Sequence, residues 1–445
     1  MTILGNSRAE DKPTAVVLGG TVAHRHLIDL LQRRGYCVVL VDYLPKPPAA
    51  DLADLHLQES TLEMETVLKI ATDFNAQLVL SPAVDQAHVT AAYCSEMLGL
   101  RTPIPFAIGN LLADKQVQKQ LMNQSGVPTA KAQIFELPEK NGPFLGQEPS
   151  VDFPAVVKPT DSNGSKGVSV VRTYDELLRA CVSAASISRK KNILVEELNA
   201  GPEFSFYFWV NNFEPRLIYS KIKVRLSESD SSLFAPLSLA HPALSVSQQN
   251  QVADISNRIV SATGLSTGPL MIQANLVQGI FKVIEFAPRL GGGLSTLEIE
   301  RVTGVDLLAL YLDRCLNKPE CIPLEIPSQQ MLSAVLHLYS GSGAVSRVIG
   351  LQELVDDSYF EEFHFQRDFS HRKDASGLES RNRILALHGT YSCFADVKIA
   401  IEALKSTLVF LGDSERNLLR KDLLNLDWRS VEEFFPAQPR IQTHD

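Results

Sequence analysis

The 445-residue sequence lacks the patterns that mark membrane and secreted proteins. No stretch offers the roughly 20 uninterrupted apolar residues that a membrane-spanning helix needs. The first eleven residues, MTILGNSRAED, lack the basic start and the long apolar run of a signal peptide. We therefore expect a cytoplasmic protein without a membrane partner.

Cysteine pairs and excess positive charge are also missing. The six cysteines are scattered and include no Cys-x-x-Cys pair. We expect buried thiols in a reducing compartment, and neither a cysteine metal site nor a disulfide framework. The formal net charge of −9 argues against a nucleic-acid surface, because duplex affinity depends mainly on neutralising phosphates. A small anionic ligand in a local basic pocket is compatible with this charge.

Two common nucleotide-binding motifs are absent. No Gly-x-x-x-x-Gly-Lys-Ser/Thr loop occurs in the chain. Residues 14–20, a helical pattern and a strand at 36–42 predict the first βαβ unit of a parallel α/β domain. The full Gly-x-Gly-x-x-Gly is missing, so we interpret Gly19-Gly20 as a tightly packed turn. The alternative is a dinucleotide site with Asp42 as ribose ligand.

The stretch 270–293 carries the most informative pattern. It predicts two strands joined by a turn at Gln278-Gly279. Glu285 lies in an apolar strand, where an unpaired charge is costly, so a positive group should lie beside it. The hairpin would bring Gln273 opposite Glu285, and the two could share one hard cation through oxygen atoms.

Two neighbouring segments suit an anionic ligand. Arg289 has the planar fork that matches phosphate or carboxylate, and the glycines at 291–293 let backbone N–H groups approach. Lys158 ends an apolar strand and precedes the glycine- and serine-rich loop 161–167. Such a loop can cover phosphates and close like a flap, but an ordinary exposed hairpin is the alternative.

Two more segments have ambiguous polar residues. A helix is expected between residues 110 and 128, with Asn110 as N-cap and with Val117 and Leu121 on its buried side. Lys115 falls in its first turn, where the helix dipole disfavours a cation, so it has either another partner or simple solvation. The glutamates of the segment 195–206, VEELNAGPEFSF, either face solvent or grip a ligand's hydroxyls and amines.

The segment 195–206 resembles the adenine-binding hinge of the ATP-grasp superfamily. The order around it is similar to that family too: Asp114-Lys115, Lys158 with its loop, the hinge, and then the strand pair ending in EFAPRLGGG. This resemblance runs over roughly residues 14–310. It is nearest to the carboxylate-amine ligases that include L-amino-acid (dipeptide) ligases, through Glu-x-x-x-Arg-x-Gly-Gly and the following Thr-Gly-Val-Asp at 303–306.

The resemblance implies an α/β protein with an ATP-grasp fold. An N-terminal parallel, Rossmann-like α/β domain would occupy residues 1–110. The small lid subdomain would occupy 111–200 and the catalytic, metal-binding subdomain 201–325. A C-terminal α+β lobe would occupy 326–445.

It also implies an ATP and Mg²⁺ site, with Mn²⁺ as an alternative metal. Lys115 and Lys158 would hold the phosphates, and the loop 161–167 would close over them. Glu285 and Gln273 would hold the metal. A first metal is expected and a second is left open, because Ala287 stands where many relatives carry Asn and Gln273 replaces the commoner acid. The other residues that the resemblance places around the nucleotide are Ser165, Gly167, Glu196, Glu197, Asn199 and Glu203; the backbones of Glu197 and Asn199 would read adenine, and Glu203 would bind the ribose.

The implied reaction is attack of a substrate carboxylate on the γ-phosphate, followed by capture of the acyl phosphate by an amine. Arg289 would stabilise the transferring phosphoryl group, with Lys158 as the second catalytic residue. The amides of Gly292 and Gly293 would hold the carboxylate. The expected partners are a small carboxylate and a small amine, with a homodimer as a further possibility. The basic residues Lys221, Lys223, Arg225 and His241 are expected at the surface.

Three functions fit this sequence. The first is an ADP-forming ligase that forms an amide or peptide bond, with an amino acid as one substrate. The second is a purine-biosynthetic or carboxylase-type enzyme of the same superfamily, since Glu-x-Ala-Pro-Arg also occurs there. The third is a regulatory ATP-binding module without catalysis, which Ala287 and Gln273 would favour.

Overall fold

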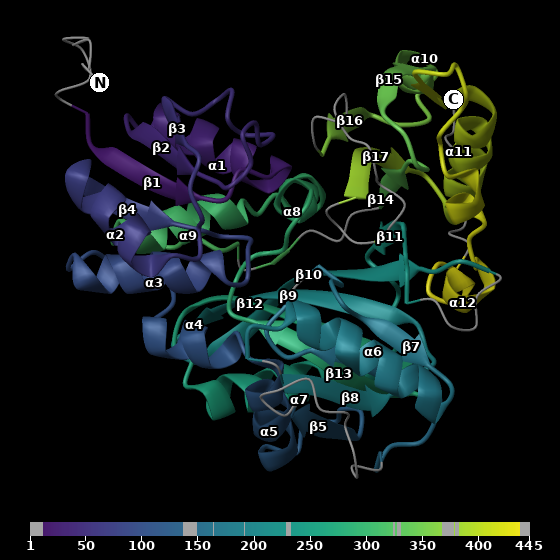
Figure 1. Ribbon diagram of the computed structural model, residues 1–445, viewed down its shortest axis with the longest axis horizontal. Helices are drawn as coiled ribbons and strands as arrows, with labels where there is room; N and C mark the ends of the chain where they lie inside the picture. The colour runs from purple at the N-terminus through teal and green to yellow at the C-terminus, as the bar shows by residue number, and fades with distance from the viewer. Residues whose placement is uncertain are drawn as a thin grey trace.

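The computed structural model describes residues 12–136, 149–162, 164–190, 192–227, 233–323, 325–326, 331–366, 378 and 382–436. Figure 1 shows an N-terminal α/β part beside α8 and α9, a central region around β9, β10 and β12, and the C-terminal strands and helices on the other side. No helix among these residues is long and apolar enough to cross a membrane.

The N-terminal part is a parallel sheet with strand order β3-β2-β1-β4. The backbone N–H of Gly20 donates to Asp42 Oδ2 at 2.7 Å, and a Cβ on Gly20 would lie 2.5 Å from Pro47 Cβ. Asp42 therefore closes the tight turn after β1, as the packing interpretation requires. The elements are β1 (Thr14–Leu18), α1 (Val22–Arg33), β2 (Cys37–Val41), β3 (Leu55–Leu57), α2 (Met64–Asp73), β4 (Ala76–Leu80) and α3 (Ala87–Met97).

The next part is an antiparallel four-stranded sheet with order β5-β8-β6-β7, covered by one helix. Leu177 and Cys181 of that helix pack in one apolar cluster with Val157 and Val195 of the sheet. This small core fixes the strand that ends at Lys158 against the strand that carries Glu196. The elements are α4 (Phe106–Leu112), α5 (Lys115–Gln124), β5 (Ala132–Glu136), β6 (Ala155–Pro159), β7 (Ser169–Val171), α6 (Tyr174–Ile187) and β8 (Asn192–Glu197).

An eight-stranded sheet forms the centre, with order β13-β12-β9-β10-β11-β14-β17-β16. Its side chains alternate between two cores: Phe204 and Phe206 face one core, while Tyr207 and Trp209 face a second core with the N-terminal part. The C-terminal strands continue this sheet. The elements are β9 (Glu203–Asn211), β10 (Glu214–Val224), β11 (Leu237–Ala240), α7 (Val246–Thr263), β12 (Gly268–Val277), β13 (Ile280–Ala287), α8 (Ser295–Thr303), α9 (Leu307–Cys315), β14 (Leu332–Tyr339), β16 (Glu362–Phe365) and β17 (Arg383–Tyr391).

The C-terminal region adds a two-stranded sheet and helices that pack on the first of these cores. Val397, Ile401 and Leu404 supply the apolar face of α11. The elements are β15 (Val345–Ile349), α10 (Leu351–Asp356), α11 (Phe394–Thr407), β18 (Val409–Gly412), η2 (Lys421–Leu424) and α12 (Arg429–Glu432).

The hairpin prediction is confirmed. β12 and β13 are antiparallel, Gln278 and Gly279 occupy the turn with φ of 50° and 80°, and Gln273 pairs directly with Glu285. The two side chains therefore start from adjacent positions on neighbouring strands.

Two other predictions are wrong. The single helix with Asn110 as N-cap is divided into α4 and α5, and the N-cap of α5 is Asp114, whose side chain accepts from the Gln116 N–H at 2.9 Å. The fully buried residues of α5 are Gln118, Lys119 and Met122, while Val117 and Leu121 are half-buried, and Leu121 still packs on the apolar core. Gln118 is buried because it bonds the Leu112 carbonyl and the Phe286 N–H, and Lys119 because it faces the polar cavity.

The cysteines differ partly from expectation. All six are free thiols. Cys94, Cys181 and Cys315 are buried, but Cys321 and Cys393 are exposed. The prediction of uniformly buried thiols is therefore wrong for the last two.

Candidate active site

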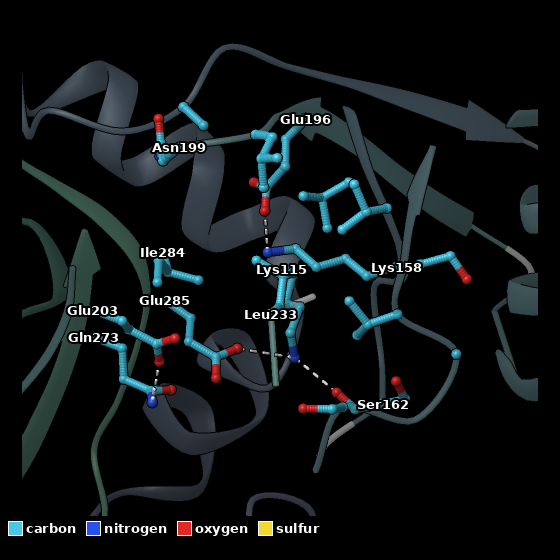
Figure 2. A pocket seen from close by; sticks show the side chains of 18 of the residues that line it. Lys115, Lys158, Ser162, Glu196, Asn199, Glu203, Leu233, Gln273, Ile284 and Glu285 are labelled. Carbon is cyan, nitrogen blue, oxygen red and sulfur yellow. Dashed lines mark hydrogen bonds and ion pairs between the residues drawn. The ribbon is translucent and has the colours of Figure 1, made fainter. Parts of the chain in front are cut away.

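A cavity of about 550 Å³ lies between the four-stranded sheet and the edge of the eight-stranded sheet. Lys115 and Lys119 of α5, described residues of the loop after β6, and the segment Glu197–Asn199 after β8 all line it. The structure brings ten of the sequence-predicted residues to this cavity: Lys115, Lys158, Ser165, Gly167, Glu196, Glu197, Asn199, Glu203, Gln273 and Glu285. Figure 2 shows several of them pointing toward one another.

Glu196 forms two equally buried ion pairs in this cavity, one with Lys158 and one with Lys119. Lys158 Nζ contacts Glu196 Oε1, and Lys119 Nζ lies 2.8 Å from Glu196 Oε2. All three side chains are no more than 7% exposed. Burial alone would raise the pKa of Glu196, but the two ammonium groups outweigh it and lower that pKa. The trio carries one surplus positive charge into the cavity, which suits an anionic ligand.

Lys115 and Glu285 form a second ion pair in the cavity. Lys115 Nζ lies 3.3 Å from Glu285 Oε2 and donates to the Ser162 carbonyl at 2.7 Å (Figure 2). Burial opposes the charge of Lys115, yet Glu285 and Asp85 raise its pKa above the ordinary value. Burial likewise opposes the charge of Glu285, but Lys115 and Lys158 lower its pKa. Lys115 therefore has a specific partner, and the solvation alternative is wrong.

The Gln273 amide lies between two carboxylates. In one orientation its nitrogen is 3.4 Å from Glu203 Oε1 (Figure 2). In the opposite orientation, which satisfies both ends of the amide, its nitrogen donates to Glu285 Oε1 at 2.8 Å and its oxygen accepts from Lys223 Nζ at 3.2 Å. The amide has partners either way, so it can present its oxygen or its nitrogen to this corner of the cavity.

Glu203 has basic neighbours from β10. Lys223 Nζ contacts its Oε1, and Arg225 Nη2 lies 3.8 Å from its Oε2. Lys223 and Arg225 line the cavity, and Lys221 is buried, with Nζ 3.2 Å from Glu298 Oε2. The expectation of surface positions is therefore wrong for these three residues, because Lys221 and Lys223 belong to β10, in the middle of the sheet, and Arg225 directly follows that strand.

The segment after β8 offers polar backbone groups to the cavity. The Glu197 N–H is already used, since it donates to the Lys131 carbonyl at 3.0 Å. The Asn199 carbonyl accepts from the Gly201 N–H at 3.1 Å. Of these two residues, only the Asn199 N–H and the Glu197 carbonyl are therefore suited to read a base edge.

The loop over β6 needs residues that tolerate positive φ. Ser165 has φ of 62° and Gly167 has φ of 73°. A Cβ on Gly167 would lie 2.9 Å from Ile187 Cδ1 and 3.0 Å from Pro159 Cγ. Gly167 therefore lets the loop fold back tightly over the strand that carries Lys158.

Arg289, Gly292 and Gly293 lie outside the cavity lining. The Arg289 Nε donates to Asp85 Oδ1 of the N-terminal part, and Nη1 donates to the Leu290 carbonyl at 2.8 Å. Burial opposes the charge of Asp85, but Arg289 lowers its pKa. The structure therefore fixes Arg289 at the junction of the N-terminal part with β13, and its contact with the cavity is electrostatic, through Glu285 and Lys115.

Sequence reasoning missed Lys119, Asp85 and Asn275. Asn275 lines the cavity and donates to the Gly201 carbonyl at 3.1 Å. Lys119 falls four residues after Lys115, so helical spacing could have placed both on one face. Asp85 has no local signal, because its partner is 204 residues away.

The residues around Glu285 suit a hard cation. Glu285 supplies carboxylate oxygens, and the Gln273 amide can turn its oxygen toward them. Oxygen donors of this kind are the ligands that Mg²⁺ prefers. A bound cation would replace the positive charge that Lys115 gives Glu285.

Residues 113–292 match the family model of the phosphoribosylglycinamide synthetase ATP-grasp (A) domain. The phosphoribosylamine–glycine ligase of Nostoc is 28% identical over 231 residues, which cover 48% of this chain and 53% of that protein. The chain spans about half the length, or less, of the curated relatives it matches. These relatives are named as ligases, synthases or transferases, in agreement with the prediction of an enzyme.

Two solved structures show the same fold. An L-amino acid ligase from Bacillus licheniformis has a TM-score of 0.72 at 19% identity, covering 89% of this chain and 98% of its own. A biotin carboxylase domain from Hydrogenobacter thermophilus, crystallised with MgADP and bicarbonate, has a TM-score of 0.64 at 14% identity, covering 89% of both chains. Residues 113–292 therefore match an ATP-grasp domain, as the resemblance predicted, and the likenesses to solved structures confirm the predicted fold.

Proposed function

We propose that the protein is an ADP-forming carboxylate-amine ligase that uses MgATP and joins an acid, with an amino acid as one substrate, to an amine. The observation that carries this proposal is the single cavity in which Lys115, Lys158, Gln273 and Glu285 meet. Phosphate-binding cations and metal-binding oxygens in one place are what phosphoryl transfer requires.

The chain's own residues would do three things. Lys158 and Lys115 would exchange their present carboxylate partners for phosphate oxygens, and the loop 161–167 would exclude water from an activated acid. The hinge groups at Glu197 and Asn199 would orient adenine, and Glu203 would take the ribose. Glu285 and Gln273 would hold Mg²⁺, which neutralises phosphate charge when it is bound.

Arg289 would complete the site from the N-terminal side. Its pairing with Asp85 fixes the guanidinium, and a fixed positive group loses little energy to reorganisation when charge develops. The amides of Gly292 and Gly293, which follow Arg289 after Leu290 and Gly291, would hold the acid. Positioning and charge neutralisation would then supply most of the acceleration.

The direct test is a phosphate-release screen over amino acids, singly and in pairs, followed by mass measurement of the product. Release of ADP with a new amide product supports the proposal. If MgATP binds normally but no acid and amine release ADP or phosphate, the ligase proposal fails, and a non-catalytic nucleotide-binding module becomes the better account. That module would be stabilised thermally by nucleotide without turnover.

A purine-biosynthetic or carboxylase-type activity is the second candidate. The match of residues 113–292 to the phosphoribosylglycinamide synthetase domain favours it. The same screen separates the two candidates when it is repeated with other substrates. These are bicarbonate, formate, aminoimidazole ribonucleotide, and the pair of glycine and phosphoribosylamine. In either case the proposed location is the cytoplasm, and a homodimer is one proposed assembly.

A further inference from the structure

The Gly293 backbone lies against two side chains of the C-terminal strands. A Cβ placed on Gly293, which has φ of 65°, would lie 3.7 Å from His337 Cε1 and 4.0 Å from Arg383 Nη1. His337 belongs to β14 and Arg383 to β17, and these strands pair in the eight-stranded sheet. Neither side chain lines the cavity between the two sheets. A second polar cluster, formed by His337 and Arg383, therefore lies beside the glycines at 291–293.

Among the described residues, no acid balances the charge of Arg383. Its Nε donates to the Tyr339 hydroxyl at 3.2 Å, and no carboxylate pairs with it in the part of the chain that the structure describes. The neighbouring lysines differ, since Lys221 pairs with Glu298 and Lys223 with Glu203. Arg383 is half-buried, and a guanidinium in such a place retains donors for an anionic partner.

His337 adds an unused hydrogen-bonding group. Its Nδ1 is buried and has no hydrogen-bond partner among the described residues. Burial, together with the charges of Arg383, Lys221 and Lys223, holds the pKa of His337 well below its usual value. The neutral ring can donate one hydrogen bond, whereas a metal cation at this place would be repelled by Arg383.

We propose that Arg383, His337 and the Gly293 backbone form an anion-binding subsite for the non-reacting carboxylate or phosphate of a substrate. This inference rests on the proposed function, because it places the subsite beside the loop that would hold the acid. An amino acid supplies a carboxylate and a phosphorylated amine supplies a phosphate, and a guanidinium fork matches either group.

The test is calorimetric binding to the full chain in the presence of Mg²⁺ and a non-hydrolysable ATP analogue. One arm compares amino acids with their C-terminal amides. The other compares glucosamine 6-phosphate with glucosamine. In the wild type we expect the anionic member of one pair to bind about tenfold more tightly or better, in line with a charge-assisted hydrogen-bonded contact. The arm that shows this preference identifies the anion.

The variants decide whether Arg383 is responsible. Arg383→Ala should remove the preference, and Arg383→Lys should restore part of it, since the charge returns without the fork. Arg420→Ala is the matched control, because Arg420 already pairs with Asp422 at 2.6 Å on the surface, and it should keep the wild-type preference.

Two results would overturn the subsite. One is a wild type that shows no preference in either arm; the other is a preference that persists in Arg383→Ala, which would assign the anion to Arg289 or another group. Failure of the proposed function is a separate outcome. It would appear as absent ADP formation in the substrate screen, while the binding preference and its loss in Arg383→Ala would remain measurable.

Discussion

Lys115 Nζ lies 3.3 Å from Glu285 Oε2, so the predicted phosphate ligand and the predicted metal ligand are paired with each other. Both residues come from distant parts of the chain, α5 and β13. If a cation and a phosphate bind together, Glu285 can pair with the cation and Lys115 with the phosphate. The pair therefore links metal binding to nucleotide binding.

Glu285→Gln should impair metal and nucleotide binding without impairing folding. We expect Mg²⁺-dependent ADP formation to fall on the order of 100-fold or more, since a charged metal ligand is lost. The melting temperature should change little, because Lys115 retains the Ser162 carbonyl as an acceptor. Glu214→Gln, at an exposed position on β10, is the control and should leave activity unchanged. Equal activity in both variants would contradict the metal assignment.

Glu196→Gln should destabilise the protein. It leaves Lys119 and Lys158 buried together without their shared acid, and loss of one member of a buried ion pair costs about 3 kcal/mol or more. Urea unfolding gives the change in free energy. Glu402→Gln, which breaks the exposed pair with Lys405, should cost less than about 1 kcal/mol. Similar losses in the two variants would argue against a buried network.

The same network predicts a dependence of stability on pH. The folded-state pKa of Glu196 is lowered, so its contribution is present above the ordinary glutamate pKa of about 4.3 and is lost as the pH falls below it. The difference in unfolding free energy between wild type and Glu196→Gln should therefore shrink as the pH drops below about 4.3. A difference that stays constant through this acid range would show that the carboxylate charge is not responsible.

Asp85→Asn should affect catalysis more than nucleotide binding. Asp85 holds Arg289 but does not line the cavity, so removing its charge should loosen the guanidinium, while Lys115 keeps its direct partners Glu285 and the Ser162 carbonyl. We expect kcat to fall about tenfold or more while the Kd for MgATP stays within about twofold. Asp51→Asn, in an exposed pair with Arg25, is the control. A weaker Kd with unchanged kcat would move Arg289 out of the proposed catalytic role.

Local patterns in the sequence predicted the hairpin at Gln278-Gly279, the pairing of Gln273 with Glu285, and the order of the segments around the cavity. The errors have physical causes. The helix expected from Asn110 breaks at Asp114, which serves as a new N-cap. Gln118 and Lys119 are buried on α5 where apolar residues were expected, because Gln118 bonds backbone groups at Leu112 and Phe286 and Lys119 faces the polar cavity.

Long-range contacts could not be predicted in this way. The Asp85–Arg289 and Lys221–Glu298 pairs join residues that no spacing rule connects. Likewise, the C-terminal strands extend the central sheet, and this continuity places His337 and Arg383 beside Gly293. Only the folded chain brings these groups together.

The most direct measurement of the central claim is ADP release by the wild type and by Glu285→Gln, with Mg²⁺, ATP and pairs of amino acids, and with the product identified by mass. We expect one ADP for each new amide in the wild type and almost none in the variant. ADP-coupled amide formation that survives in Glu285→Gln would remove Glu285 from the metal site, and its absence from a wild type that binds MgATP would overturn the proposed ligase function.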